Sequence, residues 1–296
     1  MTLGPIDPAQ VAGDPVSVGS LPLTGERTVP EIAEENYWYR RHEVVYQWAA
    51  ERWVRPDRRQ PAATPRVIID AGCGEGYGAA LLASAASDTQ PKTAEAVVVG
   101  LELDVSAAEH AARRYDRLDI VRSNLDALPI ASSQATLLVS LQVVEHLWDL
   151  AGFIKECVRV LADGGVAVIS TPNRLTFSPG LRRGEKPTNP FHVEEFDADQ
   201  LLTLLDTARL SDVHCFGLHH GSRISAWEQV HGSIVDAQIR AAVAANNESA
   251  PTADDARSRE LDHFVSSITT ADFNITEVDL NAAQDLIVVG RVGVVE

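Results

Sequence analysis

The sequence predicts an α/β fold built on a doubly wound, mostly parallel sheet with helices on both faces. Short apolar runs rich in β-branched residues alternate with amphipathic helical segments along the chain, which is typical of parallel βαβ units. A glycine-rich turn follows the first of these runs, "RVIID" at 66–70. The apolar share of 45% in 296 residues is enough for one large buried core.

Each expected element has its own pattern. Residues 30–55 carry apolar side chains at helical spacing and stop before Pro56, so a helix is expected there. Strands are expected at 66–70, 96–103, 119–124, 135–141, 166–172 and 285–294. Further helices are expected at 79–86, 106–115, 153–161 and 197–210, the last with Asp197 or Asp199 as its N-cap.

The chain is expected to form one domain behind a short tail. Residues 1–25 are rich in Pro and Gly and read as a flexible tail, with neither the basic start nor the apolar run of a signal peptide. Within the domain at 26–296, the core is expected at about 65–215 plus the strand at 285–294. The mixed, polar segment at about 216–280 is expected to be an accessory region or lid.

Charge and cysteine usage limit the partners and the compartment. A formal net charge of −17 disfavours nucleic acid and anionic lipid, whereas a neutral or cationic partner is compatible with it. No apolar run is long enough to span a membrane. Cys73, Cys157 and Cys215 lie far apart, which indicates free thiols in a reducing compartment. A cytoplasmic protein is therefore expected.

The turn after the first strand carries the strongest motif. In "VIIDAGCGEGYGAALL", Asp70 precedes four glycines spaced two residues apart, between a strand and a helix. Glycines there let the backbone approach a ligand closely, and the helix N-terminus offers unpaired N–H groups. An acid beside such a turn would repel a pyrophosphate. It suits a cationic ligand that carries an amino group.

This stretch resembles motif I of the class I S-adenosylmethionine-dependent methyltransferases, and the resemblance continues in order over about 65–175. It implies a seven-stranded Rossmann-like sheet, with Asp70 near the amino-acid part of the cofactor. It also implies that Glu102 holds the ribose hydroxyls, with Asp104 the weaker candidate. The cofactor-binding residues implied are Asp70, Gly72, Cys73, Gly74, Tyr77, Glu102, Leu103, Asn124, Leu125 and Leu141. Departures from the usual pattern are Glu102 instead of Asp and Thr136 where an Asp is common.

A second motif, "LQVVEHLWDL" at 141–150, breaks an apolar run with polar residues. In a helix Gln142, Glu145 and His146 would share one face. They could be a helix cap with a solvated edge, or a chemical site. In the resembling family this segment lies beside the transferred methyl group. There His146 could remove a hydroxyl proton, or Glu145 and His146 could bind a divalent cation.

His192 in "NPFHVEEF" bears on this choice. A Glu-x-x-Glu-His run followed by a distant His resembles the magnesium site of small-RNA 2′-O-methyltransferases, and related runs occur in ubiquinone-pathway O-methyltransferases. In this chain Gln142 stands in place of the first Glu and retains a carbonyl oxygen as a ligand. The resemblance implies Mg²⁺ or Mn²⁺ held by Glu145, His146 and His192, with Gln142 as a further candidate. A structural histidine is the alternative for His192.

The acceptor side has weaker signals. In "ENYWYRRHEVVY", Tyr37 and Trp38 could stack on sugar rings and Arg40 could bind hydroxyls, or the segment could be a helix packed on the sheet. Asn173 and His219 lie in polar stretches that could line a groove. Exposed aromatic residues near the N-terminus would suit a homodimer.

Nearly the whole chain after about residue 21 resembles the mycobacterial methyltransferases of methylmannose polysaccharide and methylglucose lipopolysaccharide synthesis. This narrower resemblance implies O-methylation of a sugar hydroxyl in a neutral manno- or gluco-oligosaccharide. Two alternatives stay open: an O-methyltransferase that acts on a phenol or quinone-type molecule, and a non-catalytic cofactor-binding protein of the same fold.

Overall fold

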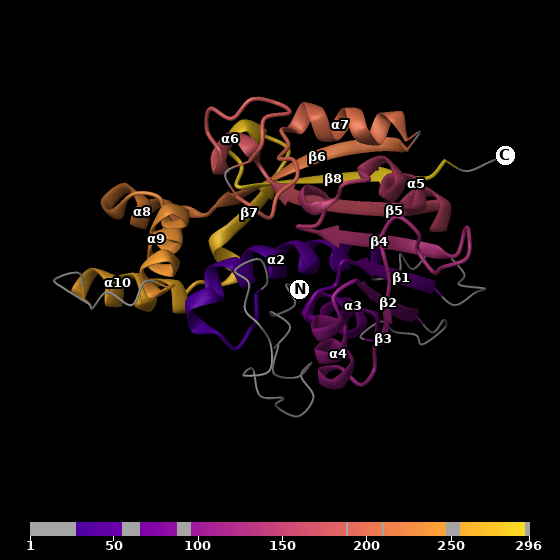
Figure 1. The fold of residues 1–296 in the computed structure, drawn as a ribbon, viewed down its shortest axis with the longest axis horizontal. Helices are drawn as coiled ribbons and strands as arrows, with labels where there is room; N and C mark the ends of the chain where they lie inside the picture. The colour runs from indigo at the N-terminus through magenta and orange to yellow at the C-terminus, as the bar shows by residue number, and fades with distance from the viewer. Residues whose placement is uncertain are drawn as a thin grey trace.

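The computed structural model describes residues 28–54, 66–87, 96–187, 189–208, 210–246 and 255–293. The tail expected at 1–25 lies outside these residues. The described strands form one eight-stranded sheet in the order β3-β2-β1-β4-β5-β8-β6-β7 (Figure 1). Strands β3, β2, β1, β4 and β5 are parallel to one another. Strand β8 is antiparallel to β5, β6 is antiparallel to β8, and β7 is antiparallel to β6.

The strands carry the apolar runs of the sequence. Their bounds are β1 (Arg66–Ala71), β2 (Ala96–Glu102), β3 (Asp119–Arg122), β4 (Ala135–Leu141), β5 (Leu161–Pro172), β6 (Ser211–His220), β7 (Phe273–Thr276) and β8 (Asp285–Arg291). The doubly wound, mostly parallel α/β class is thus confirmed. The expected count of seven strands was wrong, because β7 adds an eighth strand at the edge beside β6.

Helices cover both faces of the sheet. Their bounds are α2 (Asn36–Ala49), α3 (Tyr77–Ser87), α4 (Val105–Arg114), α5 (Leu150–Val160), α6 (Arg174–Phe177), α7 (Ala198–Thr207), α8 (Ser222–His231), α9 (Ile234–Asn246) and α10 (Asp255–Ser266). A π-helical turn, η3 (Ala50–Val54), continues α2, and short 3₁₀ turns are η2 (Ala33–Glu35), η4 (Val144–His146), η5 (Thr270–Asp272) and η6 (Leu280–Ala282). One apolar core joins α2 and α3 to the sheet, and a second joins α5 and α7 to the opposite face.

The segment after β4 differs from the expected helix. Gln142 takes a left-handed conformation with φ of 56°, η4 makes a single turn, and α5 begins only at Leu150 with Asp149 as its N-cap. The expectation that Gln142, Glu145 and His146 share one helical face was therefore wrong. The backbone N–H of Gln142 still pairs with the Ser170 carbonyl at 2.9 Å, so sheet bonding extends past Leu141 and delays the helix.

Two strands were not predicted. β6 and β7 include residues within the range expected for the accessory segment, 216–280. A shift of register between Ser211 and His214 interrupts the pairing of β6 with β8, and such a bulge breaks the alternation that marks a strand in a sequence. After β6, the helices α8, α9 and α10 lie together at one end of the molecule (Figure 1). Among the described residues no helix is both long enough and apolar enough to cross a bilayer.

Candidate active site

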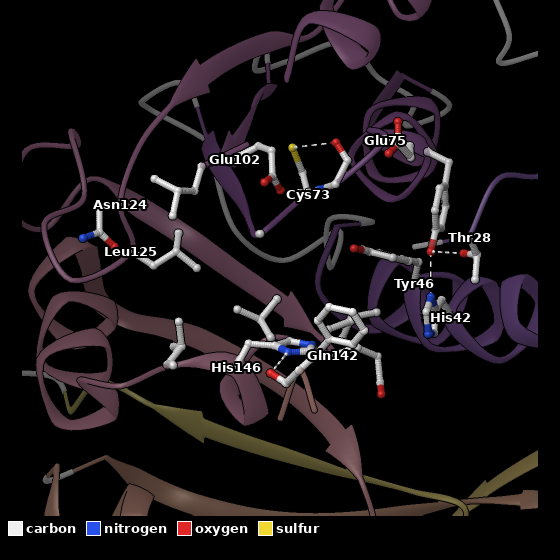
Figure 2. A pocket seen from close by; sticks show the side chains of 18 residues that line it. Thr28, His42, Tyr46, Cys73, Glu75, Glu102, Asn124, Leu125, Gln142 and His146 are labelled. Carbon is white, nitrogen blue, oxygen red and sulfur yellow. Dashed lines mark hydrogen bonds between the residues drawn. The ribbon is translucent and has the colours of Figure 1, made fainter. Parts of the chain in front are cut away.

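A cavity of about 450 Å³ lies where β1, β2 and β4 end, at the edge of the sheet where α/β folds bind ligands. Figure 2 shows Glu102 and Cys73 on one side of it and Gln142 and His146 on another. Most of the predicted cofactor residues line it together: Gly72, Cys73, Gly74, Tyr77, Glu102, Leu103, Asn124, Leu125 and Leu141. Asp70 is the exception, because it is fully buried beneath the glycine turn.

The turn between β1 and α3 depends on glycine. Gly72 has φ of +81°, and a Cβ at that position would lie 2.5 Å from a methyl carbon of Val143. The N–H groups of Gly72 and Cys73 both donate to the Leu101 carbonyl, at 2.8 and 3.0 Å. These contacts hold the turn against the end of β2 and against the segment after β4, which forms the opposite wall.

Asp70 is held by a residue that sequence reasoning missed. The hydroxyl of Tyr46, on α2, donates to Oδ1 of Asp70 at 3.0 Å, and the backbone N–H of Ala79 also stabilises this carboxylate. Burial raises the pKa of the Asp70 carboxyl from 3.8 to about 7. A buried carboxylate next to the cavity favours a cationic group there. Tyr46 lies in the aromatic N-terminal segment, but the sequence does not tell which of its aromatic residues faces the turn.

Asp70 should make stability depend on pH. Its pKa is higher in the folded protein, so the stabilising contribution of its protonated form is present below pH 4 and is lost as pH rises through 7. Asp70→Asn is therefore expected to raise the unfolding free energy at pH 8 by on the order of a few kcal/mol and to leave it unchanged at low pH. Urea unfolding at both pH values measures this, with the exposed Asp119→Asn as control. If the unfolding free energy of Asp70→Asn changed with pH as much as that of the wild type, Asp70 would not be the cause of the pH dependence.

Of the two acids after β2, only Glu102 lines the cavity. Its Oε2 accepts from the Gly74 N–H at 2.9 Å and its Oε1 from the Asp104 N–H at 2.8 Å. Asp104 instead caps α4 by accepting from the Ala107 N–H at 3.0 Å. Of these two acids, Glu102 is therefore the one that can contact a ligand in the cavity.

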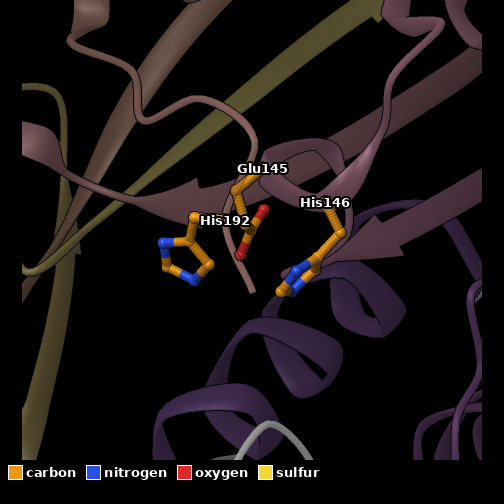
Figure 3. A group of neighbouring side chains, drawn as sticks. All are labelled: Glu145, His146 and His192. Atoms are coloured by element: carbon orange, nitrogen blue, oxygen red, sulfur yellow. The ribbon is translucent and has the colours of Figure 1, made fainter. Parts of the chain in front are cut away.

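The structure brings together three of the four residues predicted as metal ligands, without Gln142. One nitrogen or oxygen atom from each of Glu145, His146 and His192 lies within 4.8 Å of the others, although His192 comes from a different segment of the chain. Figure 3 shows the Glu145 carboxylate between the two imidazole rings. His146 also lines the cavity, so this cluster opens toward the cofactor residues.

The surroundings of Glu145 and His146 define what each can do. The Thr171 hydroxyl donates to Oε2 of Glu145 at 3.0 Å, and burial raises the pKa of this carboxyl to about 7. Nδ1 of His146 lies 3.0 Å from the carbonyl oxygen of Phe191. A carbonyl only accepts, so Nδ1 carries the hydrogen, and Nε2 of the neutral ring can bind a proton or a cation.

Gln142 lines the cavity through an ordered amide. Its Nε2 donates to Ser170 Oγ at 3.2 Å and to Asp285 Oδ1 at 3.4 Å, which leaves the amide oxygen as the group available for a ligand. Asp285 is itself paired with Arg41 in a two-point contact, and both side chains are at most 2% exposed. Neither Arg41 nor Asp285 was predicted as a site residue; no local pattern joins positions so far apart.

The predicted substrate contacts are not among the residues that line the cavity. Tyr37 is fully buried, with its hydroxyl 2.8 Å from Nε2 of His220. Asn173 is fully buried too, and its Nδ2 donates to backbone carbonyls between Leu280 and Ala283. These two residues present no group to this cavity, because tertiary contacts turn them inward.

The remaining candidates also lie outside the cavity lining. Trp38 packs near Phe177 with the rings tilted and their centroids 6.4 Å apart, and Arg40 pairs with Glu43 on its own helix. His219 lies on β6. The lining residues that sequence reasoning did not name include Thr28, His42, Tyr46 and Phe191.

Comparison with known proteins identifies the family. A model of the methyltransferase domain matches residues 69–169. A probable S-adenosylmethionine-dependent methyltransferase from Mycolicibacterium smegmatis is 42% identical over 283 residues, which is 94% of this chain and 98% of that protein. This chain belongs to the class I S-adenosylmethionine-dependent methyltransferases. S-adenosylmethionine is its methyl donor.

Other known proteins resemble this chain over a shorter stretch or at lower sequence identity. A ubiquinone biosynthesis O-methyltransferase from Parvibaculum lavamentivorans is 30% identical over 115 residues, covering 36% of this chain and 40% of that protein. In fold, the chain is similar to a methyltransferase of Thermotoga maritima described as a possible histamine N-methyltransferase, with a TM-score of 0.51 and 14% identity, covering 87% of this chain and 94% of that one. At this identity the similarity concerns the fold alone.

Proposed function

We propose that the protein is an O-methyltransferase that methylates a sugar hydroxyl of a neutral manno- or gluco-oligosaccharide in polymethylated polysaccharide synthesis. The observation that carries this proposal is the Glu145–His146–His192 cluster, which borders the cavity lined by the predicted cofactor residues through His146. A hydroxyl is a weak nucleophile until its proton is removed or its oxygen is polarised, and the cluster offers groups for both. The net charge of −17 also favours a neutral acceptor over RNA.

In this proposal the cavity binds the donor in one orientation. Asp70 provides negative charge near the cationic amino group, and Glu102 binds the ribose hydroxyls at the end of β2. Glu102 already accepts two backbone N–H groups, so its carboxylate is fixed in place before the donor arrives. Asn124 and Leu125 would contact the adenine, and His146, which also lines the cavity, would face the acceptor.

Glu102→Ala is expected to weaken S-adenosylmethionine binding about 10- to 100-fold, because a hydrogen bond to a charged group contributes on the order of 1.5–3 kcal/mol. Titration calorimetry with S-adenosylhomocysteine measures the change. Asp104→Asn is the matched control, since it keeps an N-cap for α4 and changes an acid that does not line the cavity. Equal weakening in both variants would argue against a specific role for Glu102.

The donor set of the cluster fits a divalent cation. Glu145 offers a buried carboxylate, His146 and His192 offer imidazole nitrogens, and the amide oxygen of Gln142 is a fourth candidate. The carboxylate and the amide oxygen suit Mg²⁺ or Mn²⁺, and the two imidazole nitrogens favour Mn²⁺ over Mg²⁺. When bound, the cation would act as a Lewis acid that lowers the pKa of the acceptor hydroxyl. In its absence Nε2 of His146 would act as the base, since this ring lines the cavity.

The reaction balances with these groups. The acceptor oxygen attacks the methyl carbon, the carbon–sulfur bond breaks and leaves neutral S-adenosylhomocysteine, and the hydroxyl proton passes to His146 or to a nearby base.

One assay tests the proposal. The protein is incubated with methyl-labelled S-adenosylmethionine and a panel of free and partly methylated manno- and gluco-oligosaccharides, a catechol-type phenol and an RNA oligonucleotide. Each acceptor is tested after dialysis against chelator and again with added Mg²⁺. Label in an oligosaccharide is expected, with activity restored by Mg²⁺. Label in the phenol alone would support the alternative suggested by the ubiquinone-pathway relative, and full activity without divalent ions would remove the metal from the proposal.

A further inference from the structure

One short segment, 189–195, contacts all three residues of the cluster. The N–H groups of Val193 and Glu194 donate to the backbone carbonyl of Glu145, at 2.7 and 3.3 Å. The carbonyl of Phe191 accepts from His146, as described above. His192 belongs to the segment itself. The relative placement of the three side chains therefore depends on how this segment is held.

The segment is fixed directly after its last residue. Arg174 donates its backbone N–H to the Phe196 carbonyl at 2.8 Å, and Asn173 forms an isolated β-bridge with Phe196. The Arg174 guanidinium also pairs with Asp197, the N-cap of α7. These contacts join the segment to the end of β5 and to α7, both of which pack in the core.

Within the segment, Glu195 orients His192. Oε1 of Glu195 lies 2.9 Å from Nδ1 of His192, and the two side chains are only 2% and 8% exposed. The amide Nδ2 of Asn189 lies 3.0 Å from Nε2 of the same ring. The carboxylate accepts and the amide donates, so the neutral ring carries its hydrogen on Nδ1 and a lone pair on Nε2. His146 is held in the same form by the Phe191 carbonyl.

We propose that Glu195 is a positioning residue that fixes the Nδ1–H form of His192 and, with Asn189, presets Nε2 as a cation ligand. This inference rests on the divalent cation of the proposed function and adds the residue that prepares the site for it. A ligating histidine commonly donates its second N–H to a carboxylate, which fixes the ring and raises its basicity. Asn189 occupies Nε2 and gives it up when the cation binds.

Mn²⁺ is the probe, because its binding to the whole protein can be followed by electron paramagnetic resonance. Glu195→Ala is expected to raise the Kd for Mn²⁺ about 10- to 100-fold, and Glu195→Gln, whose carbonyl still accepts from Nδ1, by less. Glu194→Gln is the control, since Glu194 accepts from Gln200 and not from His192. The Kd for S-adenosylhomocysteine should stay the same in all three variants.

A second measurement reads the imidazole directly. Nitrogen-15 NMR of histidine-labelled, metal-free protein is expected to find His192 as the Nδ1–H tautomer in the wild type, and to find the Nε2–H tautomer populated in Glu195→Ala. Wild-type Mn²⁺ affinity in Glu195→Ala, or an Nε2–H ring in the wild type, would overturn the role of Glu195 and leave the proposed function intact. Absence of Mn²⁺ binding by the wild-type protein would overturn both the proposal that the cluster binds a divalent cation and the proposal that Glu195 prepares His192 for it.

Discussion

Glu145→Ala is expected to lower kcat about 10²- to 10⁴-fold while the affinity for S-adenosylmethionine changes less than twofold. The side chain is 1% exposed, accepts from Thr171 and lies between the two imidazole rings, so its loss removes the only carboxylate of the cluster. It does not line the cavity that we propose for the donor. Single-turnover methyl transfer and calorimetry with S-adenosylhomocysteine separate the two effects.

The controls for Glu145 distinguish chemistry from folding. Glu145→Gln keeps the volume and the hydrogen bond from Thr171, so it should fold as the wild type and still lose most activity. Glu109→Ala removes an exposed acid on α4 and should change nothing. A non-catalytic cofactor-binding protein predicts instead that Glu145→Ala leaves every property of the molecule unchanged. Wild-type kcat in both Glu145 variants would exclude a catalytic role for this carboxylate.

Gly78→Ala is expected to lower the unfolding free energy by about 2–5 kcal/mol and to abolish donor binding. A Cβ at Gly78 would lie 2.0 Å from the Tyr46 ring, closer than any real contact. Tyr46 cannot move away without giving up its hydrogen bond to the fully buried carboxyl group of Asp70. The expected decrease in unfolding free energy therefore has two sources, which are overpacking and the loss of a buried hydrogen bond.

Thermal and urea unfolding measure this effect. Gly293→Ala is the matched control, because the space around that position is open and its backbone φ is not in the left-handed region. It should leave the midpoint unchanged. A Gly78→Ala protein with wild-type stability would show that α2 can shift away from α3 without cost, and that Tyr46 is not required to hold Asp70.

The part of the site that follows from the sequence is the part encoded in local patterns. Asp70 and the glycines form one contiguous motif, and Glu102 ends the next strand, so parallel strand order alone places both at one edge of the sheet. The alternation of strand and helix predicted the core elements to within a few residues. Residues whose position depends on local chain geometry could thus be located before the structure.

The part that did not follow depends on tertiary contacts. His192 joined Glu145 and His146 through resemblance to known families and not through any local pattern. Tyr37 and Asn173 were candidates for contacts with a substrate, yet they are buried and hydrogen-bond to His220 and to the turn before β8. The helix expected across Gln142 failed because pairing to Ser170 continues beyond β4, which no propensity of the segment itself reveals.

The pairing of Arg41 with Asp285 has a consequence for how the molecule acquires its site. The two residues are 244 positions apart, and each would be a buried, uncompensated charge without the other. During synthesis on the ribosome, α2 emerges early, but Arg41 gains its partner only after β8 has been made. Docking of α2 over the cavity should therefore be a late event, and the nascent chain should bind methyl donor only once Asp285 has joined the sheet.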